Sequence, residues 1–292
     1  MEVPAYLVSK VFSNNAVLAR LGDEERVIVG RGIGFGRRVG ERIPADQVQC
    51  EYFELSPDRV HYLDLMNSFD QRTFDTCVEA IKQAADLLGE LHPSVYMVLA
   101  DHLAFVVQRL REGNVIHNPL IDEIRATFPD EFIAAEVVLR YVNSSLDVEL
   151  PPDEKAFITL HLNAARVGTS VKLPLQQANA LAGIVQFARE RLGYPGISGA
   201  VHDELIWALD RLTKRLRAGT FRSNAAARSV ERDLPLETEL ASQIVERIWA
   251  SEPLPHGTAG EVAYLAVFLH GWKQDAGNEM QIDPARQKGA TR

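Results

Sequence analysis

Residues 101–110 read DHLAFVVQRL, and residues 203–212 read DELIWALDRL, with Asp, Leu, Arg and Leu at matching positions. A second pair of blocks, EKAFITLH at 154–161 and EVAYLAVF at 261–268, follows in the same order. The two offsets are 102 and 107 residues. Apolar residues recur in these segments at the spacing of a helix face. Blocks that repeat in one order at nearly one interval predict a duplicated α-helical bundle.

The helical pattern extends outward from these blocks in both directions. It begins near residue 66, and prolines punctuate it at 93, 119, 129 and 151–152. A break at residues 169–174 separates the copies. We therefore expect two helical domains, at residues 66–170 and 174–282.

The segment before the helices has the pattern of strands. Residues 5–13 alternate, Asn14-Asn15 supply a turn, and residues 16–21 and 26–29 flank a second turn at 22–24. Residues 48–55 predict a last strand. A sheet of this size buries little core, so self-association as a homodimer is expected. The predicted fold is mainly α, with a small N-terminal antiparallel β-sheet domain at 1–58 before two duplicated α-helical bundles.

A basic, glycine-rich stretch lies inside this β domain. Residues 26–42 contain five arginines against one glutamate, a local charge of +4, and glycine occupies positions 30, 32, 34 and 36. Arginines pair with phosphates, glycines let the backbone approach a partner, and Phe35 could stack on a base. The pattern therefore indicates RNA recognition, with a glycine-rich hairpin carrying solvated arginines as the structural alternative.

Composition limits the remaining classes. The chain has 292 residues, 46% hydrophobic and 24% charged, with a net charge of −9 and two cysteines. This is ordinary globular composition, and no membrane span or signal peptide is expected, so we predict a cytoplasmic protein without membrane insertion. Two cysteines cannot build a disulfide framework or a multi-cysteine metal site. We expect no metal site and no cofactor.

With these features together, the chain resembles the BglG/LicT family of transcriptional antiterminators. The resemblance rests on KVFSNN at 10–15, VGRGIGFGRR at 29–38 and the two helical repeats. It implies a co-antiterminator RNA-binding domain followed by two PTS regulation domains. The RNA-binding positions implied are Asn14, Asn15, Gly30, Arg31, Gly32, Phe35, Arg37 and Arg38. The structural alternatives are a turn for the asparagines and a place in the sheet core for Phe35.

The resemblance also implies the mode of action. A dimer of the N-terminal domain binds a hairpin in leader mRNA and prevents a terminator from forming. Histidine phosphorylation by the sugar phosphotransferase system switches it, with the sugar permease (enzyme II) and HPr as partners, and the protein is not an enzyme. A PTS-regulated DNA-binding activator is an alternative, although residues 5–55 offer no basic recognition helix. A protein-interaction module without RNA binding is a third possibility.

Two of the eight histidines occupy the implied phosphorylation sites. His102 and His161 lie in the matched blocks, and a neutral imidazole offers one nitrogen as nucleophile while the other can be oriented by a hydrogen bond. Asp101 is a candidate orienting group, or a residue that faces water. No HExxH pattern or similar close pair of histidines supports a metal site.

The second copy departs from the family at these sites. By sequence matching, Glu204 and Phe268 stand where histidine is usual, and neither accepts a phosphoryl group as imidazole does. His202 and His270 are displaced by two residues, which on a helix rotates a side chain by about 200°. We therefore expect phosphorylation by HPr to be lost or altered there. Glu204 either supplies a fixed negative charge in place of the phosphoryl group or is a solvated helix residue.

Overall fold

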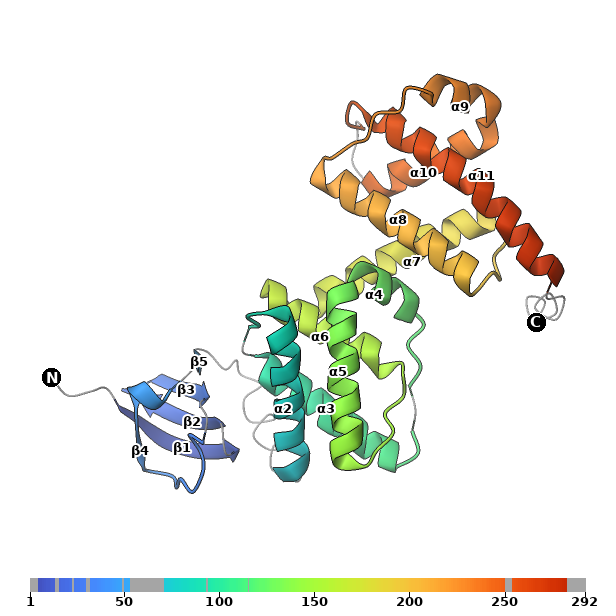
Figure 1. Cartoon of the computed structure of the whole chain (residues 1–292). Coiled ribbons are helices and arrows are strands. Elements are labelled where there is room, and N and C mark those ends of the chain that lie inside the picture. Colours follow the sequence, from blue (N-terminus) through green and yellow to red (C-terminus); the bar gives the residue numbers. More distant parts are fainter. Residues whose placement is uncertain are drawn as a thin grey trace. The chain divides into compact units, whose positions relative to one another are not determined.

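The computed structural model describes residues 5–13, 16–22, 24–29, 32–48, 50–52, 71–92, 94–114, 116–249 and 254–282. Within these residues a small antiparallel sheet precedes a series of helices, which confirms the expected mainly α fold (Figure 1). The chain divides into two compact units. One contains Met1–Asn118 and Phe128–Pro174, and the other contains Pro119–Thr127 and Leu175–Arg292.

The N-terminal sheet has five strands among the described residues. They are β1 (Ala5–Ser13), β2 (Ala16–Leu21), β3 (Glu24–Val29), β4 (Arg42–Pro44) and β5 (Cys50–Tyr52), in the order β4-β1-β2-β3-β5. All neighbours are antiparallel, and Val17 of β2 lies opposite Ile28 of β3. Val8, Val17, Ile28 and Ile43 are buried on one apolar face, as β-branched residues of a half-buried sheet should be.

The strands differ from expectation after residue 41. Arg42–Pro44 forms an edge strand that the pattern did not predict, and a short 3-10 helix, η1 (Ala45–Gln47), follows it. Pro44 has no amide hydrogen for the ladder, so the strand ends there. Of the strand expected over residues 48–55, the structure describes β5 at Cys50–Tyr52, whereas residues 49 and 53–58 lie outside the described part.

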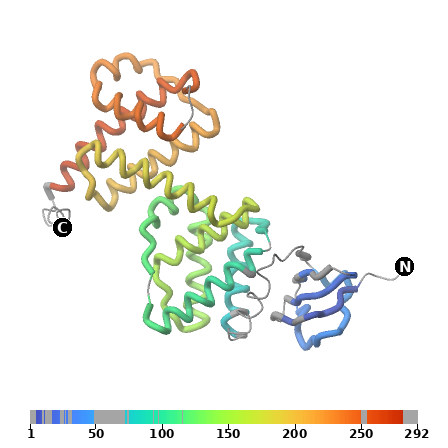
Figure 2. Tube along the Cα trace, turned by 180° about the vertical axis from the view of Figure 1, so that it is seen from behind, coloured from blue at the N-terminus to red at the C-terminus, as the bar shows by residue number. Residues whose placement is uncertain are grey.

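Among the described residues, four long helices build the helical part of the first unit. They are α2 (Gln71–Leu88), α3 (Val95–Arg111), α5 (Pro129–Leu146) and α6 (Glu154–Val167). Helix α2 lies beside α5 and α3, and α6 packs on α5 and α3 (Figures 1 and 2). Leu99, Leu103 and Val106 on one face of α3 are buried in the core between them, as their helical spacing predicts.

The second unit contains α4 (Ile121–Thr127), most of α7 (Lys172–Leu192), α8 (Ala200–Ala218), α9 (Ala227–Asp233), α10 (Pro235–Trp249) and α11 (Thr258–Ile282). Helices α10 and α11 pack on each other and on α8, around a core that includes the buried Trp272. Helix α4, which we expected in the domain at 66–170, packs on α8 instead. Ala126 is buried in this core, and Arg125 Nη2 donates to Asp203 Oδ2 at 2.9 Å.

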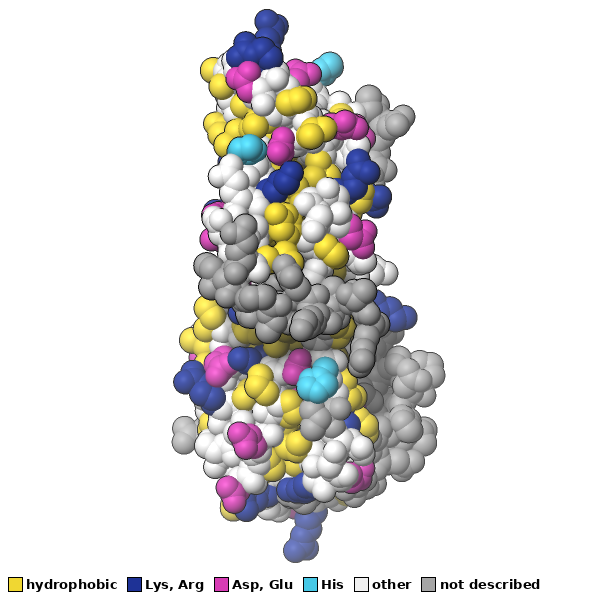
Figure 3. Space-filling model, turned by 90° about the vertical axis from the view of Figure 1, so that its right-hand side faces the viewer, with side chains coloured by type: hydrophobic (Ala, Val, Ile, Leu, Met, Phe, Trp, Pro, Cys, Tyr) yellow, Lys and Arg dark blue, Asp and Glu magenta, His cyan; other side chains and the backbone are white. Residues whose placement is uncertain are grey.

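Charged side chains of both signs are interspersed on the face drawn in Figure 3. This face therefore carries no broad field of one sign. In the part of the chain that the structure describes, no helix is both long and apolar enough to cross a membrane.

Candidate functional sites

The loop between β3 and β4 presents Phe35 to solvent. Phe35 is 73% exposed, whereas Ile33 is 2% exposed and belongs to the sheet core. The Phe35 amide donates to the Gly32 carbonyl at 3.0 Å, and Gly32 and Gly36 have φ values of 70° and 67° that favour glycine. The turn is thus anchored by Ile33 and holds the aromatic ring outward. Phe35 does not fill the sheet core, which was the structural alternative for this residue.

The two arginines that follow differ in their surroundings. Arg37 Nη2 donates to Gln47 Oε1 at 3.0 Å, and Arg37 Nη1 lies 3.7 Å from Glu41 Oε2, so Arg37 joins the loop to η1. The Arg38 side chain is exposed, and none of the described residues forms a hydrogen bond or ion pair with it. Arg38 is therefore available to an outside anion. Four of the expected RNA-binding positions lie outside the described residues: Asn14, Asn15, Gly30 and Arg31.

In the first unit the fold brings the two expected histidines together. His102 lies on α3 and His161 on α6, 59 positions apart in sequence, yet their ring centroids are 5.2 Å apart. The ring of Phe157 lies 5.9 Å from that of His102. The His102 side chain is 20% exposed, so it is partly open to solvent. The paired imidazoles form one candidate site at the contact between α3 and α6.

A buried carboxylate orients His102. Glu154, in the first turn of α6, is 0% exposed, and its Oε2 lies 3.2 Å from His102 Nε2. Arg109 Nη2 donates to the other oxygen, Oε1, at 2.5 Å and neutralises the carboxylate. A carboxylate paired with arginine accepts hydrogen bonds, so Nε2 is assigned as the donor and Nδ1 is the ring nitrogen on the side away from Glu154. Glu154 thus has the orienting role for which Asp101 was the expected candidate.

His161 stays uncharged throughout the physiological range. Burial disfavours the imidazolium ion, and the neighbouring His102 disfavours it further, so the pKa of His161 falls to about 3. A neutral imidazole has a lone pair on one nitrogen at neutral pH. His161 therefore has a lone pair that can act as a nucleophile toward a phosphoryl donor.

In the structure, α3 and α8 correspond to each other in a register that differs by one helical turn from the alignment made by sequence. Seven positions of α3 are buried among the described residues: 95, 99, 100, 103, 104, 106 and 107. For six of them, all but 95, the position 106 residues later on α8 is buried too: 205, 206, 209, 210, 212 and 213. With this register His102 corresponds to Ala208 rather than to Glu204. Arg109 corresponds to Arg215, which bonds Glu261 as Arg109 bonds Glu154.

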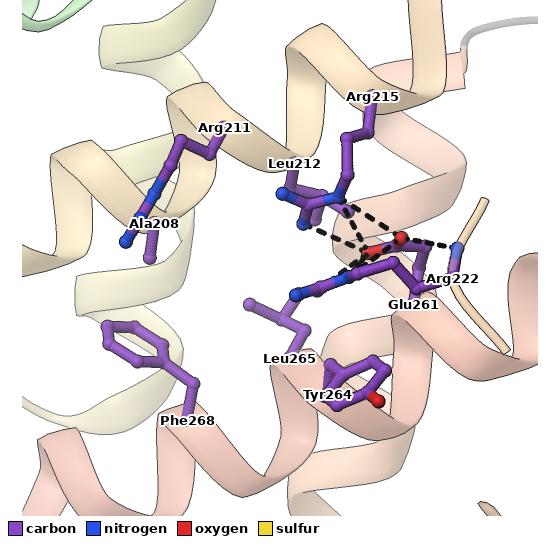
Figure 4. A pocket seen from close by; sticks show the side chains of 9 residues that line it. All are labelled: Ala208, Arg211, Leu212, Arg215, Arg222, Glu261, Tyr264, Leu265 and Phe268. Carbon is purple, nitrogen blue, oxygen red and sulfur yellow. Dashed lines mark hydrogen bonds and ion pairs between the residues drawn. The ribbon is translucent and has the colours of Figure 1, made fainter. Parts of the chain in front are cut away.

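A pocket of about 210 Å³ occupies this corresponding place in the second unit. Ala208 of α8 and Phe268 of α11 line it where the first unit has His102 and His161, and Glu261 lies at one side (Figure 4). Arg215 and Arg222 both bond the Glu261 carboxylate, at 2.8–3.2 Å. Neither a methyl group nor a phenyl ring accepts a phosphoryl group, so this copy holds no phosphohistidine at the pocket.

Gly260 allows Arg222 to approach the start of α11. A Cβ atom at Gly260 would lie 1.9 Å from the Arg222 carbonyl oxygen, so only glycine fits. The Arg222 guanidinium also lies over the ring of Tyr264, with its carbon 4.2 Å from the centroid. Burial alone would raise the pKa of Glu261, but the hydrogen bonds from Arg222 and Arg215 lower it to about 2. The carboxylate remains ionised and fixes both arginines.

The other second-copy candidates lie away from this pocket. Glu204 is exposed on α8, as a solvated residue would be. Burial, with a contribution from Arg189, lowers the pKa of His202 at the start of α8. His270 Nδ1 lies 3.3 Å from Glu237 Oε1 on α10. None of these three residues lines the pocket.

The sequence pattern missed the frame of both sites, which is the buried glutamate with its arginine partners. Glu154 and Glu261 begin the two EKAFITLH-like blocks, but their identity was used only to detect the repeat. An identical acid at the first position of both blocks was the available signal. The arginine partners of these glutamates could be recognised only from contacts between elements: Arg109 for Glu154, and Arg215 and Arg222 for Glu261.

Two family models match the first part of the chain. A CAT RNA-binding domain model matches residues 6–58, and a PRD domain model matches residues 77–165. The first match covers the β-sheet domain, and the second begins in α2 and ends in α6, so it includes His102, His161 and Glu154. The domain order agrees with the order that the sequence pattern predicted.

Part of the chain is similar to curated proteins and to a solved structure. The protein GlcT of Staphylococcus aureus strains JH9 and Newman is 29% identical over 161 residues, which is 54% of this chain and 57% of each relative. The chain thus spans about half the length of these relatives. A crystal structure of GlcT CAT-PRDI is 26% identical, covers 55% of this chain and 98% of its own, and has a TM-score of 0.47.

Proposed function

The chain carries the CAT RNA-binding domain and the PRD domain of BglG/LicT-type antiterminators, and from this premise we propose that it binds a leader-RNA hairpin under control of histidine phosphorylation. Binding of the hairpin prevents the overlapping terminator from forming. The role is regulatory rather than enzymatic. The single observation that carries the regulatory part is the His102–His161 pair, with ring centroids 5.2 Å apart and a buried Glu154 beside them.

The RNA contact is assigned to the loop between β3 and β4. Phe35 offers an exposed ring on a turn held by Ile33, and Arg38 offers an unpaired guanidinium. An exposed aromatic ring stacks on an unpaired base, and arginine bonds phosphate oxygens. Arg31, between two glycines in the same stretch, remains a proposed contact on the resemblance alone. The β domain favours an RNA loop rather than duplex DNA as the target. Duplex DNA is commonly read by a helix in the major groove, and the described residues of this domain contain no helix beyond the single turn of η1.

His102 is the proposed first acceptor of the phosphoryl group. Its Nδ1 lone pair attacks phosphorus of a phosphorylated HPr or enzyme II, and a nitrogen–phosphorus bond forms. The bond from phosphorus to the donor's leaving atom breaks, and that atom keeps the electron pair. The proton on Nε2 stays in its hydrogen bond with Glu154, which stabilises the positive charge that the ring acquires.

The added charge supplies the switch. A phosphoryl group brings a charge of about −1.5 to −2. On Nδ1 of His102 this charge would lie across the ring from Nε2 and the buried Glu154, whose counter-charge is Arg109. Repulsion between the two anions favours a rearranged contact between α3 and α6, and thereby shifts the dimer equilibrium that we propose for the active protein. Phosphorylation of this unit is the proposed inhibitory signal.

The full chain can be tested in two steps. Filter binding should retain a hairpin RNA transcribed from the region upstream of the gene, and not a duplex DNA of the same sequence. Retention of the DNA would support the activator alternative, and retention of neither would support a protein-interaction module. Purified phosphorylated HPr or permease should then label His102 or His161 and reduce RNA retention. Unchanged retention in a fully labelled protein would contradict the switch.

A further inference from the structure

The pocket of the second unit contains more positive than negative charge. Arg211, Arg215 and Arg222 line it together with Glu261, which leaves a surplus of two positive charges if all four groups are ionised (Figure 4). The pKa of Glu261, about 2, keeps its charge in place at neutral pH. An anionic ligand with about two negative charges would neutralise the surplus positive charge of these four side chains.

The three arginines keep hydrogen-bond donors free for such a ligand. A guanidinium has five N–H donors. Glu261 takes Nε and Nη2 of both Arg215 and Arg222, so the Nη1 groups of both side chains are left over. Arg211 is exposed, and among the described residues it makes no hydrogen bond or ion pair. Its side chain lies on the side of Ala208 and Phe268, away from the Glu261 cluster (Figure 4).

The size and the apolar wall limit the ligand further. The volume of about 210 Å³ is below the roughly 300–1,000 Å³ of clefts that hold drug-sized ligands. Ala208 leaves open the space that an imidazole would fill, and Leu265 and Phe268 supply apolar surface beside it. A small anion with a compact organic part therefore fits better than an extended chain.

We propose that this pocket binds the phosphate group of a small free ligand, either inorganic phosphate or a phosphate monoester such as a sugar phosphate. Phosphate carries the charge of about −1.5 to −2 that matches the surplus. Its oxygens suit the planar fork of arginine, which binds phosphate through paired N–H groups. The second unit would thus hold phosphate reversibly, without covalent transfer. The proposal rests on the pocket alone and does not depend on RNA binding or on phosphorylation of His102.

The test is isothermal titration calorimetry on the full chain without RNA. Inorganic phosphate and glucose 6-phosphate are titrated separately, in a phosphate-free buffer whose ionic strength is held constant with chloride. We expect one site per chain. Arg211→Ala should weaken binding roughly 10- to 100-fold, because it removes hydrogen bonds to a charged group. Arg217→Ala is the matched control, since Arg217 is exposed on the same helix and does not line the pocket.

The affinities of the two probes and of the variants each support or overturn phosphate binding at this pocket. Similar affinities for both probes would support a site that recognises phosphate alone, and tighter binding of glucose 6-phosphate would support added contacts with the apolar wall. Ala208→Trp fills the space without changing a charge and should abolish binding of either probe. No saturable binding, or equal losses in Arg211→Ala and Arg217→Ala, would overturn the proposal. RNA retention measured on the same variants is independent of these outcomes.

Discussion

Replacing Glu261 with glutamine tests the charged frame of the second unit. The pKa of this buried carboxylate falls from an ordinary 4.5 to about 2, and one pKa unit corresponds to about 1.4 kcal/mol. The ionised group therefore contributes about 3 kcal/mol to the free energy of unfolding. Glu261→Gln should lose that amount at pH 7, because Arg215 and Arg222 would lose their counter-charge.

The pH dependence gives the sign of the effect. A carboxylate whose pKa is lowered by folding stabilises the protein fully above its unfolded pKa, and less as the pH falls toward the folded pKa. The gap in stability between the natural protein and Glu261→Gln should therefore be largest above about pH 5, and close between pH 4.5 and pH 2. At pH 3.5 it should be about 2 kcal/mol.

Tryptophan fluorescence measures this unit selectively. All three tryptophans, Trp207, Trp249 and Trp272, belong to the second unit and its core. Urea unfolding followed by their emission at pH 7, 5 and 3.5 gives the required free energies. Glu246→Gln, on the exposed side of α10, is the matched control and should leave stability unchanged. A loss below 1 kcal/mol at pH 7, or an equal loss at pH 7 and 3.5, would refute this reasoning.

Three further outcomes are expected. Phe35→Ala should weaken hairpin binding in a filter assay roughly 10- to 100-fold through lost stacking, whereas Val39→Ala, an equally exposed apolar change in the same loop, should not. The double variant His102→Ala, His161→Ala should activate an antitermination reporter without inducing sugar, and a folded but silent variant would count against the inhibitory role. Mass spectrometry after incubation with phosphorylated HPr should find no stoichiometric phosphohistidine in residues 175–292, and a full label there would contradict the loss of the acceptor site.

The sequence predicted the duplicated helices but could not determine their exact register. Arg211 and Arg215 lie one helical turn apart, and four residues rotate a helix by about 400°, which is nearly the same direction. A short match of Asp, Leu and Arg therefore fits either register almost equally well. Only the contact of Arg215 with Glu261, across two elements, identifies the counterpart of Arg109.

Long-range packing was likewise beyond the sequence pattern. Residues 121–127 have ordinary helical spacing, and nothing in it indicates that Ala126 joins the core of the second unit. The glycine-rich turn around Phe35, in contrast, could be deduced locally, although the sequence left open whether the ring was exposed or lay in the sheet core. Turn chemistry depends on neighbouring residues, so it can be deduced locally, whereas the partner of an apolar face depends on the whole fold.

The two helical copies share one buried frame and differ in what surrounds it. Glu154 and Glu261 are both 0% exposed. Glu154 accepts a hydrogen bond from Arg109 of α3, and Glu261 accepts one from Arg215 of α8. Loss of one partner from such a buried pair costs roughly 3–5 kcal/mol, so stability alone retains the frame. The counterpart of His102, Ala208, lines an open pocket, where a smaller side chain creates space at little cost. The frame that orients an imidazole in the first copy is therefore free, in the second, to hold an anion that is not covalently attached.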